Sequence, residues 1–120
     1  MEDVDFQFSD RETCAWLEKD PEGRDVYVGQ ALRDARGGRG IDENAMALWC
    51  AVRVAREWGA SRVVGVLHYL AYSRQDKPTR SRREPTTARL VADLNACAGM
   101  DRLVRSSPAW RPSAASTASR

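Results

Sequence analysis

Apolar residues fall in short runs separated by turn residues along the first hundred positions, and these runs predict three strands. Residues Asp25–Gln30 are rich in β-branched and aromatic side chains and follow a turn at residues 21–23, so they predict a short strand. Residues Arg62–Leu67 form a nearly continuous apolar run, which is typical of a strand covered on both faces. Residues 102–104 predict the start of a third strand.

The two segments between these strands carry apolar residues at helical spacing. Asp42 is expected as the N-cap of a helix that runs to about Trp58, with a buried stripe made of Ala45, Leu48, Trp49, Val52, Ala55 and Trp58. Residues 85–87, Pro-Thr-Thr, are expected to start a second helix, which Gly99 ends. Its inward positions would be Thr87, Leu90, Val91, Leu94 and Ala98.

Strands and helices that alternate along a chain predict an α/β fold with a parallel sheet and right-handed crossover connections. Ligands of such sheets bind beyond the carboxyl ends of the strands, so the residues after Leu67 are candidates for a site. The glycine-containing segment 33–40 has neither the Lys-Ser/Thr of a P-loop nor the spacing of a dinucleotide fingerprint. It is therefore expected to be a flexible connector.

Composition indicates one globular domain with a modest core, because the chain has 120 residues, 42% of them hydrophobic and 30% charged. The longest apolar stretch is far short of a membrane span and no signal peptide opens the chain, so no membrane partner is expected. Cys14, Cys50 and Cys97 lack metal-ligand spacing, which predicts reduced thiols, a cytoplasmic protein and no zinc site.

The positive net charge comes from the end of the chain. Arg105, Arg111 and Arg120 are the only charged residues after Val104, so the first 104 residues carry 16 basic and 17 acidic side chains. Residues 74–89 nevertheless hold six cations and only two anions. Such a local excess attracts an anionic ligand, whereas a nucleic-acid-binding protein usually has a broader basic face, so no nucleic-acid partner is expected.

The chemistry of residues 74–77, Arg-Gln-Asp-Lys, suits a nucleotide. A guanidinium can donate two parallel hydrogen bonds to phosphate, and an amide can donate to and accept from the edge of a base. The segment continues into the cations Arg80, Arg82 and Arg83. A solvated run of charges is the alternative, and it would be preferred without the adjoining Arg74-Gln75-Asp76 motif.

Residues 69–94 resemble the ribose-phosphate pyrophosphokinases, whose loop reads roughly Y-x-x-Y-[SA]-R-Q-D-[KR] and then R-E-P-[IT]-[ST]-A-[KR]-L. Residues 8–12 are similar to the family's F-S-D-G-E segment, with Arg11 where glycine is usual, and residues 42–48 to its N-D-x-L-M-E-L helix start. His68 replaces a usual proline and is interpreted as a loop substitution. The resemblance covers about residues 6–104. It implies that residues 1–104 are a partial N-terminal domain with the phosphoribosyltransferase-type fold.

The resemblance also implies two halves of an ATP site. One half, from a neighbouring subunit, would contact adenine and ribose through Phe8, Asp10 and Glu12. The other half would hold ATP through Arg74, Gln75 and Asp76, followed by an anion-binding loop with Lys77, Arg80, Arg82 and Arg83. Arg11 in place of glycine could crowd the approach of the nucleotide.

Members of this family transfer diphosphate from ATP to ribose 5-phosphate and so make phosphoribosyl pyrophosphate for nucleotide biosynthesis. The resemblance implies Mg²⁺ as cofactor and a homo-oligomer or homologous subunits as partners. It also implies that the metal-binding histidine, the lysine-arginine loop and the ribose-phosphate loop follow the third strand. None of them is present, so we expect no catalytic residue, no metal ligand and a truncated, inactive fragment.

Residues 105–120 are rich in Ser, Ala and Arg and lack apolar periodicity, which is typical of disorder. However, if the codons for residues 112–120 are translated in the frame that starts at their third bases, they can encode the peptide IRGFYGIP. This peptide resembles the family's Q-I-x-G-F-Y segment. A frameshift near Val104 is therefore our hypothesis for this tail.

Three interpretations stay open at this stage. The chain is a truncated member of the family, a non-catalytic subunit that associates with active homologues, or a small module that binds anions or nucleic acid through its arginine-rich loop.

Overall fold

The computed structural model describes residues 5–33, 38–78, 81–105 and 116–117. In chain order the elements are β1 (Asp5–Gln7), β2 (Thr13–Ala15), β3 (Asp25–Gln30), α1 (Ile41–Glu57), β4 (Arg62–Leu67), α2 (Thr87–Ala98), β5 (Arg102–Arg105) and β6 (Ser116–Thr117). The predicted α/β class and the alternation of strands and helices are therefore confirmed.

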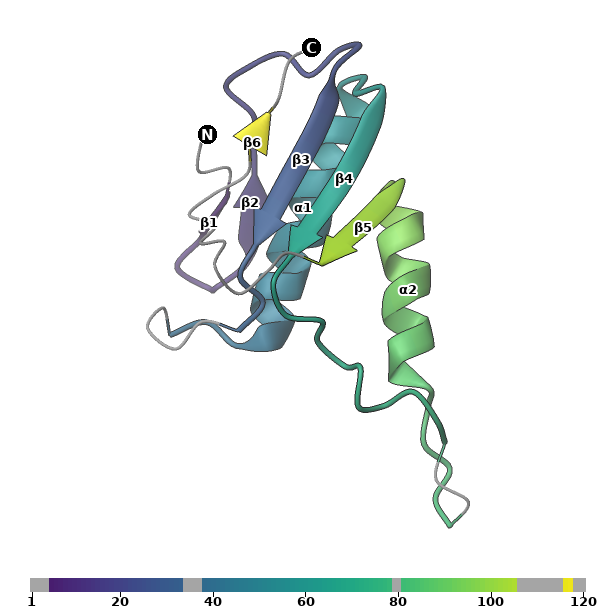
Figure 1. Ribbon diagram of the computed structural model, residues 1–120. Coiled ribbons are helices and arrows are strands. Elements are labelled where there is room, and N and C mark those ends of the chain that lie inside the picture. Colours follow the sequence, from purple (N-terminus) through teal and green to yellow (C-terminus); the bar gives the residue numbers. More distant parts are fainter. Residues whose placement is uncertain (1–4, 34–37, 79–80, 106–115, 118–120) are drawn as a thin grey trace.

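A four-stranded sheet in the order β5-β4-β3-β6 forms the centre of the molecule (Figure 1). The strands β3, β4 and β5 run parallel. β3 pairs with β4 along its whole length, from Asp25 opposite Arg62 to Gln30 opposite Leu67. At the first of these pairs Asp25 accepts a hydrogen bond from Arg62, which raises the pKa of that guanidinium. Because the register is unbroken, the carboxyl ends of β3 and β4 meet at one edge of the sheet, next to the start of α1.

The core lies between this sheet and α1. Val26, Val28 and Val63 from the strands are almost fully buried, as are Leu48 and Val52 from the helix. β-Branched side chains suit the pleated surface, and the apolar positions of α1 recur at helical spacing, so each element turns one face inward. This packing holds the carboxyl ends of the strands in place.

Residues 5–15 form a hairpin that the apolar pattern did not predict as strands. β1 and β2 pair antiparallel in a sheet of their own, with Asp5 opposite Ala15 and Gln7 opposite Thr13. The helix α1 packs against β2. The hairpin presents residues 8–12 at its turn, which we call the 8–12 turn.

Two expectations about α1 are wrong. The N-cap is Gly40, not Asp42, because the backbone N–H of Gly40 donates to the Glu43 side chain at 3.3 Å and the helix begins at Ile41. Asp42 lies in the first turn, where a carboxylate interacts favourably with the helix dipole. Trp58 is the C-cap and 68% exposed, so it is not a core residue.

The helix α2 is less buried than its pattern predicts. Its start after Thr86 and its end at Gly99, whose φ is 113°, agree with the prediction. Leu90, however, is 50% exposed, and Ala98 is the one buried residue of this helix. Its C-terminal half contacts α1 through a hydrogen bond that Trp49 Nε1–H donates to Asn95 Oδ1 at 2.8 Å. Its N-terminal half extends past the sheet (Figure 1).

The end of the chain contributes two described residues after β5. Ser116–Thr117 form β6, which pairs antiparallel with β3 at Val26 and Tyr27, a strand that the composition of the tail did not predict. Residues 106–115 and 118–120 lie outside the described part. Among the described residues, no helix is both long and apolar enough to cross a membrane.

Candidate functional site

A long loop, residues 68–86, leaves the carboxyl end of β4 and projects from the body before α2 begins (Figure 1). Near its start Tyr72 has a φ of 64°, and the N–H of Gln75 donates to the Tyr72 carbonyl at 3.0 Å. A non-glycine residue in the left-handed region is uncommon and reverses the chain locally. Arg74 and Gln75 follow directly after this reversal.

A pocket of about 290 Å³ lies between this part of the loop and the first turn of α1. Tyr69 and Tyr72 are half-buried and pack against the core, so two walls of the pocket are held by the fold. The side chains that line it are Ile41, Asp42, Tyr69, Tyr72, Arg74 and Gln75. This pocket is where the topology expects a ligand of an open α/β sheet.

The chemistry of the pocket is mixed. Arg74 is exposed and can donate to an anion, and the first backbone N–H groups of α1 add a partial positive charge. Asp42 places a carboxylate in the same turn, so the site is not uniformly positive. The tyrosines supply aromatic surface. Such a set can hold the phosphate of a ligand at Arg74 and a planar ring against the tyrosines.

Gln75 also has a structural role. Its side-chain Oε1 accepts a hydrogen bond from Thr87 Oγ1 at 2.5 Å, and its carbonyl accepts one from Ala88 N–H at 3.1 Å. These bonds tie the loop to the first turn of α2. With its oxygen held in this way, the amide offers a ligand its NH₂ group.

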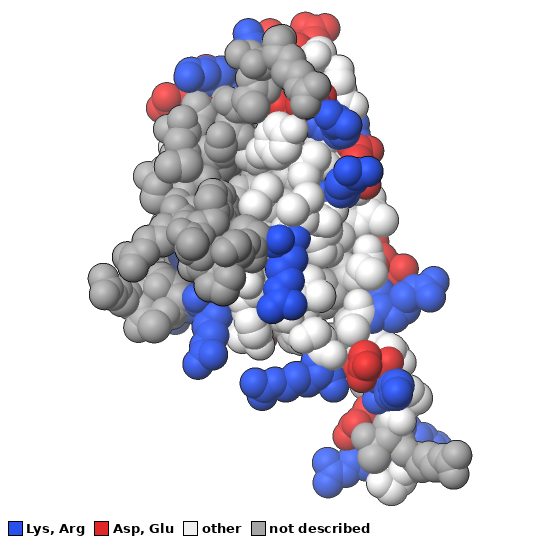
Figure 2. Space-filling view, viewed as in Figure 1, with Lys and Arg blue, Asp and Glu red and all other residues white. Residues whose placement is uncertain are grey.

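The remaining residues of the predicted loop lie along the projecting arm, where Asp76, Lys77, Arg82 and Arg83 are all exposed. Figure 2 shows acidic side chains among the basic ones there, and Arg82 is 3.7 Å from Glu84. Arg80 lies outside the described residues. The structure therefore brings Arg74 and Gln75 together in a pocket, and it leaves the described cations of the loop in solvent.

The 8–12 turn is stabilised by its own backbone. Phe8 N–H donates to the Glu12 carbonyl and Arg11 N–H to the Phe8 carbonyl, both at 2.8 Å, while Glu12 N–H donates to Asp10 Oδ1 at 3.0 Å. Phe8 is 49% exposed, and Asp10 and Glu12 are also exposed. An aromatic ring and two carboxylates thus face solvent on one turn.

The two predicted half-sites do not meet within the chain. In Figure 1 the 8–12 turn lies at one side of the molecule and the 68–86 loop projects on the other, with the start of α1 between them. Phe8, Asp10 and Glu12 do not line the pocket of Arg74 and Gln75. The sequence did not predict Ile41 and Asp42 as pocket residues. The apolar pattern of the helix does not indicate which loop packs against its first turn.

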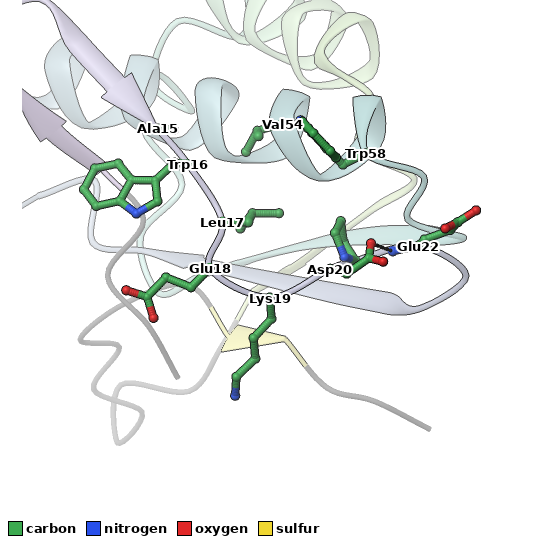
Figure 3. A pocket seen from close by; sticks show the side chains of 10 residues that line it. Ala15, Trp16, Leu17, Glu18, Lys19, Asp20, Glu22, Val54 and Trp58 are labelled. Atoms are coloured by element: carbon green, nitrogen blue, oxygen red, sulfur yellow. Dashed lines mark hydrogen bonds between the residues drawn. The ribbon is translucent and has the colours of Figure 1, made fainter.

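A larger pocket, about 590 Å³, lies at the opposite end of α1. Figure 3 shows Leu17 between Trp16 and Trp58, while Glu18 and Lys19 extend away from the helix. Its lining includes the charged residues Glu18, Lys19, Asp20 and Glu22. It lies beside the amino ends of β3 and β4, whereas ligands of open α/β sheets bind beyond the carboxyl ends, so it is not the candidate site. Among the described residues, no group of three or more His, Cys, Asp or Glu side chains could hold a metal ion.

Comparisons with known proteins agree on one family. The family model for the N-terminal domain of ribose phosphate pyrophosphokinase matches residues 4–99. The ribose-phosphate pyrophosphokinases of Buchnera aphidicola subsp. Schizaphis graminum and Haemophilus influenzae are each 35% identical over 98 residues. Those 98 residues are 82% of this chain and 30% of each relative.

A solved structure gives the same result for the fold. The crystal structure of phosphoribosylpyrophosphate synthetase from Mycobacterium smegmatis matches with a TM-score of 0.76 and 30% identity. The match covers 87% of this chain and 33% of that one. The parallel sheet with its two helices is thus the fold of a known domain, and the chain spans about a third of the length of the proteins it matches.

Proposed function

Since the chain belongs to the family of the N-terminal domain of ribose phosphate pyrophosphokinase, we propose that it carries the ATP-binding part of such an enzyme. The complete reaction would transfer diphosphate from ATP to ribose 5-phosphate and give phosphoribosyl pyrophosphate. The chain spans 30% of its curated relatives, so this activity is proposed for the whole enzyme and not for the 120 residues alone.

The observation that carries the proposal is the pocket of Arg74 and Gln75 at the carboxyl end of β4. A forked guanidinium suits phosphate oxygens, and an amide suits the edge of a base. Tyr69 and Tyr72 are anchored in the core and offer a rigid aromatic wall. We assign Arg74 and Gln75 direct contacts with ATP, and Asp76 a place at the mouth of the pocket.

The second half of the site would come from another chain. Phe8, Asp10 and Glu12 are exposed on the 8–12 turn but lie away from the pocket of their own chain. A homo-oligomer, or an assembly with homologous subunits, would bring this turn to a neighbour's pocket. Phe8 would then stack on the base, and the two carboxylates would accept hydrogen bonds from the ligand.

The exposed cations of the arm fit a role in attracting the nucleotide. Lys77, Arg82 and Arg83 are exposed on the arm that continues from Arg74 and Gln75, and Arg80 belongs to the same stretch of sequence. Clustered cations raise the local concentration of an anion and speed its association, an effect that salt weakens. These residues would therefore change the rate of ATP binding more than the geometry of the bound state.

The described residues contain no group of three or more His, Cys, Asp or Glu side chains that could hold a metal ion, so we assign no metal ligand to them. Mg²⁺ would be a cofactor of the complete enzyme. There it would stabilise the charge that develops during diphosphate transfer, while we assign contacts with the nucleotide to this part of the chain.

ATP binding to the full chain tests the proposal. We expect Arg74→Ala to weaken binding, measured by calorimetry at low salt, about tenfold or more, because it removes charge-assisted hydrogen bonds. Arg24→Ala is the matched control, since Arg24 is exposed and precedes the amino end of β3. Equal dissociation constants for the two variants would contradict the assignment.

A non-catalytic subunit is the second candidate. Leu90, Leu103 and Val104 on α2 and β5 are all exposed, and β5 is the outer strand of the sheet. Unpaired strand edges and apolar side chains favour association. Co-elution with a complete homologue and a change in that enzyme's activity would support this role. A salt-dependent shift of DNA or RNA, without competition by ATP, would favour a nucleic-acid module instead.

A further inference from the structure

Arg11 has a backbone conformation that its side chain disfavours. Its φ is 72°, in the left-handed region, where non-glycine residues meet steric strain. The turn requires this conformation, because Arg11 N–H donates to Phe8 and Phe8 N–H donates to Glu12 across it. Glycine would satisfy the same geometry without strain, so the backbone alone does not account for an arginine here.

The side chain of Arg11 supplies a contact that glycine cannot make. Its Nη2 lies 2.7 Å from Glu43 Oε1, and Glu43 Oε2 accepts the N–H of Gly40 at 3.3 Å. The carboxylate of Glu43 therefore joins the hairpin turn to the N-terminus of α1. Ile41 and Asp42, the residues just before Glu43, line the pocket of Arg74 and Gln75.

We propose that Arg11 is a positioning residue that couples the 8–12 turn to the pocket through Glu43. The turn and the pocket have no lining residue in common, yet both are attached to the first turn of α1. The ion pair fixes the direction in which Phe8, Asp10 and Glu12 are presented to a neighbouring chain. This inference rests on the proposed nucleotide site, since it assigns Arg11 a purpose in building that site.

The charge of Arg11 supports this role. Its guanidinium forms its ion pair with Glu43 of α1 and, among the described residues, none with Asp10 or Glu12 of its own turn. The side chain also reaches toward α1 to form this pair.

The test compares Arg11→Gly with Arg11→Ala in the full chain. Glycine removes the ion pair and the strain together, whereas alanine removes the ion pair and keeps most of the strain. Amide exchange at Phe8, followed by NMR, reports the order of the turn, and the melting temperature reports global stability. The matched control is Lys19→Ala, because Lys19 is an exposed cation that follows the hairpin.

We expect Arg11→Gly to speed exchange at Phe8 by up to about fivefold, the range of a surface ion pair, without lowering the melting temperature. Arg11→Ala should speed exchange and also lower the melting temperature. The charge swap Arg11→Glu with Glu43→Arg should restore slow exchange relative to either single variant.

Unchanged exchange at Phe8 in both Arg11→Gly and Glu43→Gln would overturn the inference. An ATP titration of the same samples separates it from the proposed function. Wild-type signals of Arg74 and Gln75 that do not respond to ATP would refute the nucleotide site, while the exchange data would still decide the role of Arg11.

Discussion

Arg56 offers a quantitative test of how the two helices are joined to the sheet. Near the C-terminal end of α1 its guanidinium donates to three partners: Gly99 O and Ala60 O, each at 3.2 Å, and Asp101 Oδ2 at 2.5 Å. Asp101 Oδ2 also accepts the N–H of Val63 at 2.8 Å. One side chain thus connects the end of α1, the end of α2 and the start of β4.

We predict that Arg56→Ala lowers the free energy of unfolding by about 2.5 kcal/mol. Each lost hydrogen bond to a carbonyl contributes about 1 kcal/mol. The ion pair adds only about 0.5 kcal/mol, because the side chains of Arg56 and Asp101 are 34% and 41% exposed and solvent screens them. Asp101 keeps its bond from Val63, whereas the carbonyls of Gly99 and of the buried Ala60 lose the donor that Arg56 supplies.

Urea unfolding followed by far-UV circular dichroism measures this loss. Arg56→Ala should lower the midpoint and leave the slope with denaturant unchanged. Arg24→Ala, an exposed arginine without a side-chain partner of this kind, should stay within about 0.5 kcal/mol of the wild type. Equal stabilities of the two variants would refute the role of Arg56. A cycle with Asp101→Ala would then give additive effects instead of coupling.

Two further predictions follow from the same structure. Gly99→Ala should cost about 1–2 kcal/mol more than Gly23→Ala in the same urea assay: both glycines have positive φ, but a Cβ at Gly99 would lie 3.0 Å from Arg56 Cγ, whereas nothing lies within 4 Å at Gly23. Equal losses of stability in the two variants would show that the Arg56 side chain moves away from the added methyl group without a loss of stability. The isolated chain should form no phosphoribosyl pyrophosphate from ATP, Mg²⁺ and ribose 5-phosphate in a radiochemical assay, and detectable product would contradict the proposal that this activity needs the length of the relatives.

Local sequence was sufficient for the main elements. The strands Asp25–Gln30 and Arg62–Leu67 have the predicted bounds, because β-branched residues and flanking turns act over a few positions. The end of α2 at Gly99 was also predicted, since a left-handed residue there is a local requirement. The family resemblance in residues 69–94 is likewise a property of the sequence, and the comparisons confirm it.

Burial was predicted less well, because it depends on which elements end up side by side. Trp58 and Leu90 fit apolar stripes by spacing alone, but Trp58 caps α1 at its end and α2 contacts the body mainly through its C-terminal half. The hairpin of residues 5–15 was missed because its strands have three residues each. Strands so short carry almost no periodic signal.

The sequence by itself determined the fold class, the family and the residue types of the candidate site. The tertiary structure alone decided that Ile41 and Asp42 complete the pocket of Arg74 and Gln75, and that the 8–12 turn lies apart from it. It also paired Arg11 with Glu43. The pattern along the chain indicates whether each residue favours a buried or an exposed position and a helix or a strand. Contacts between distant segments depend in addition on how the elements pack together.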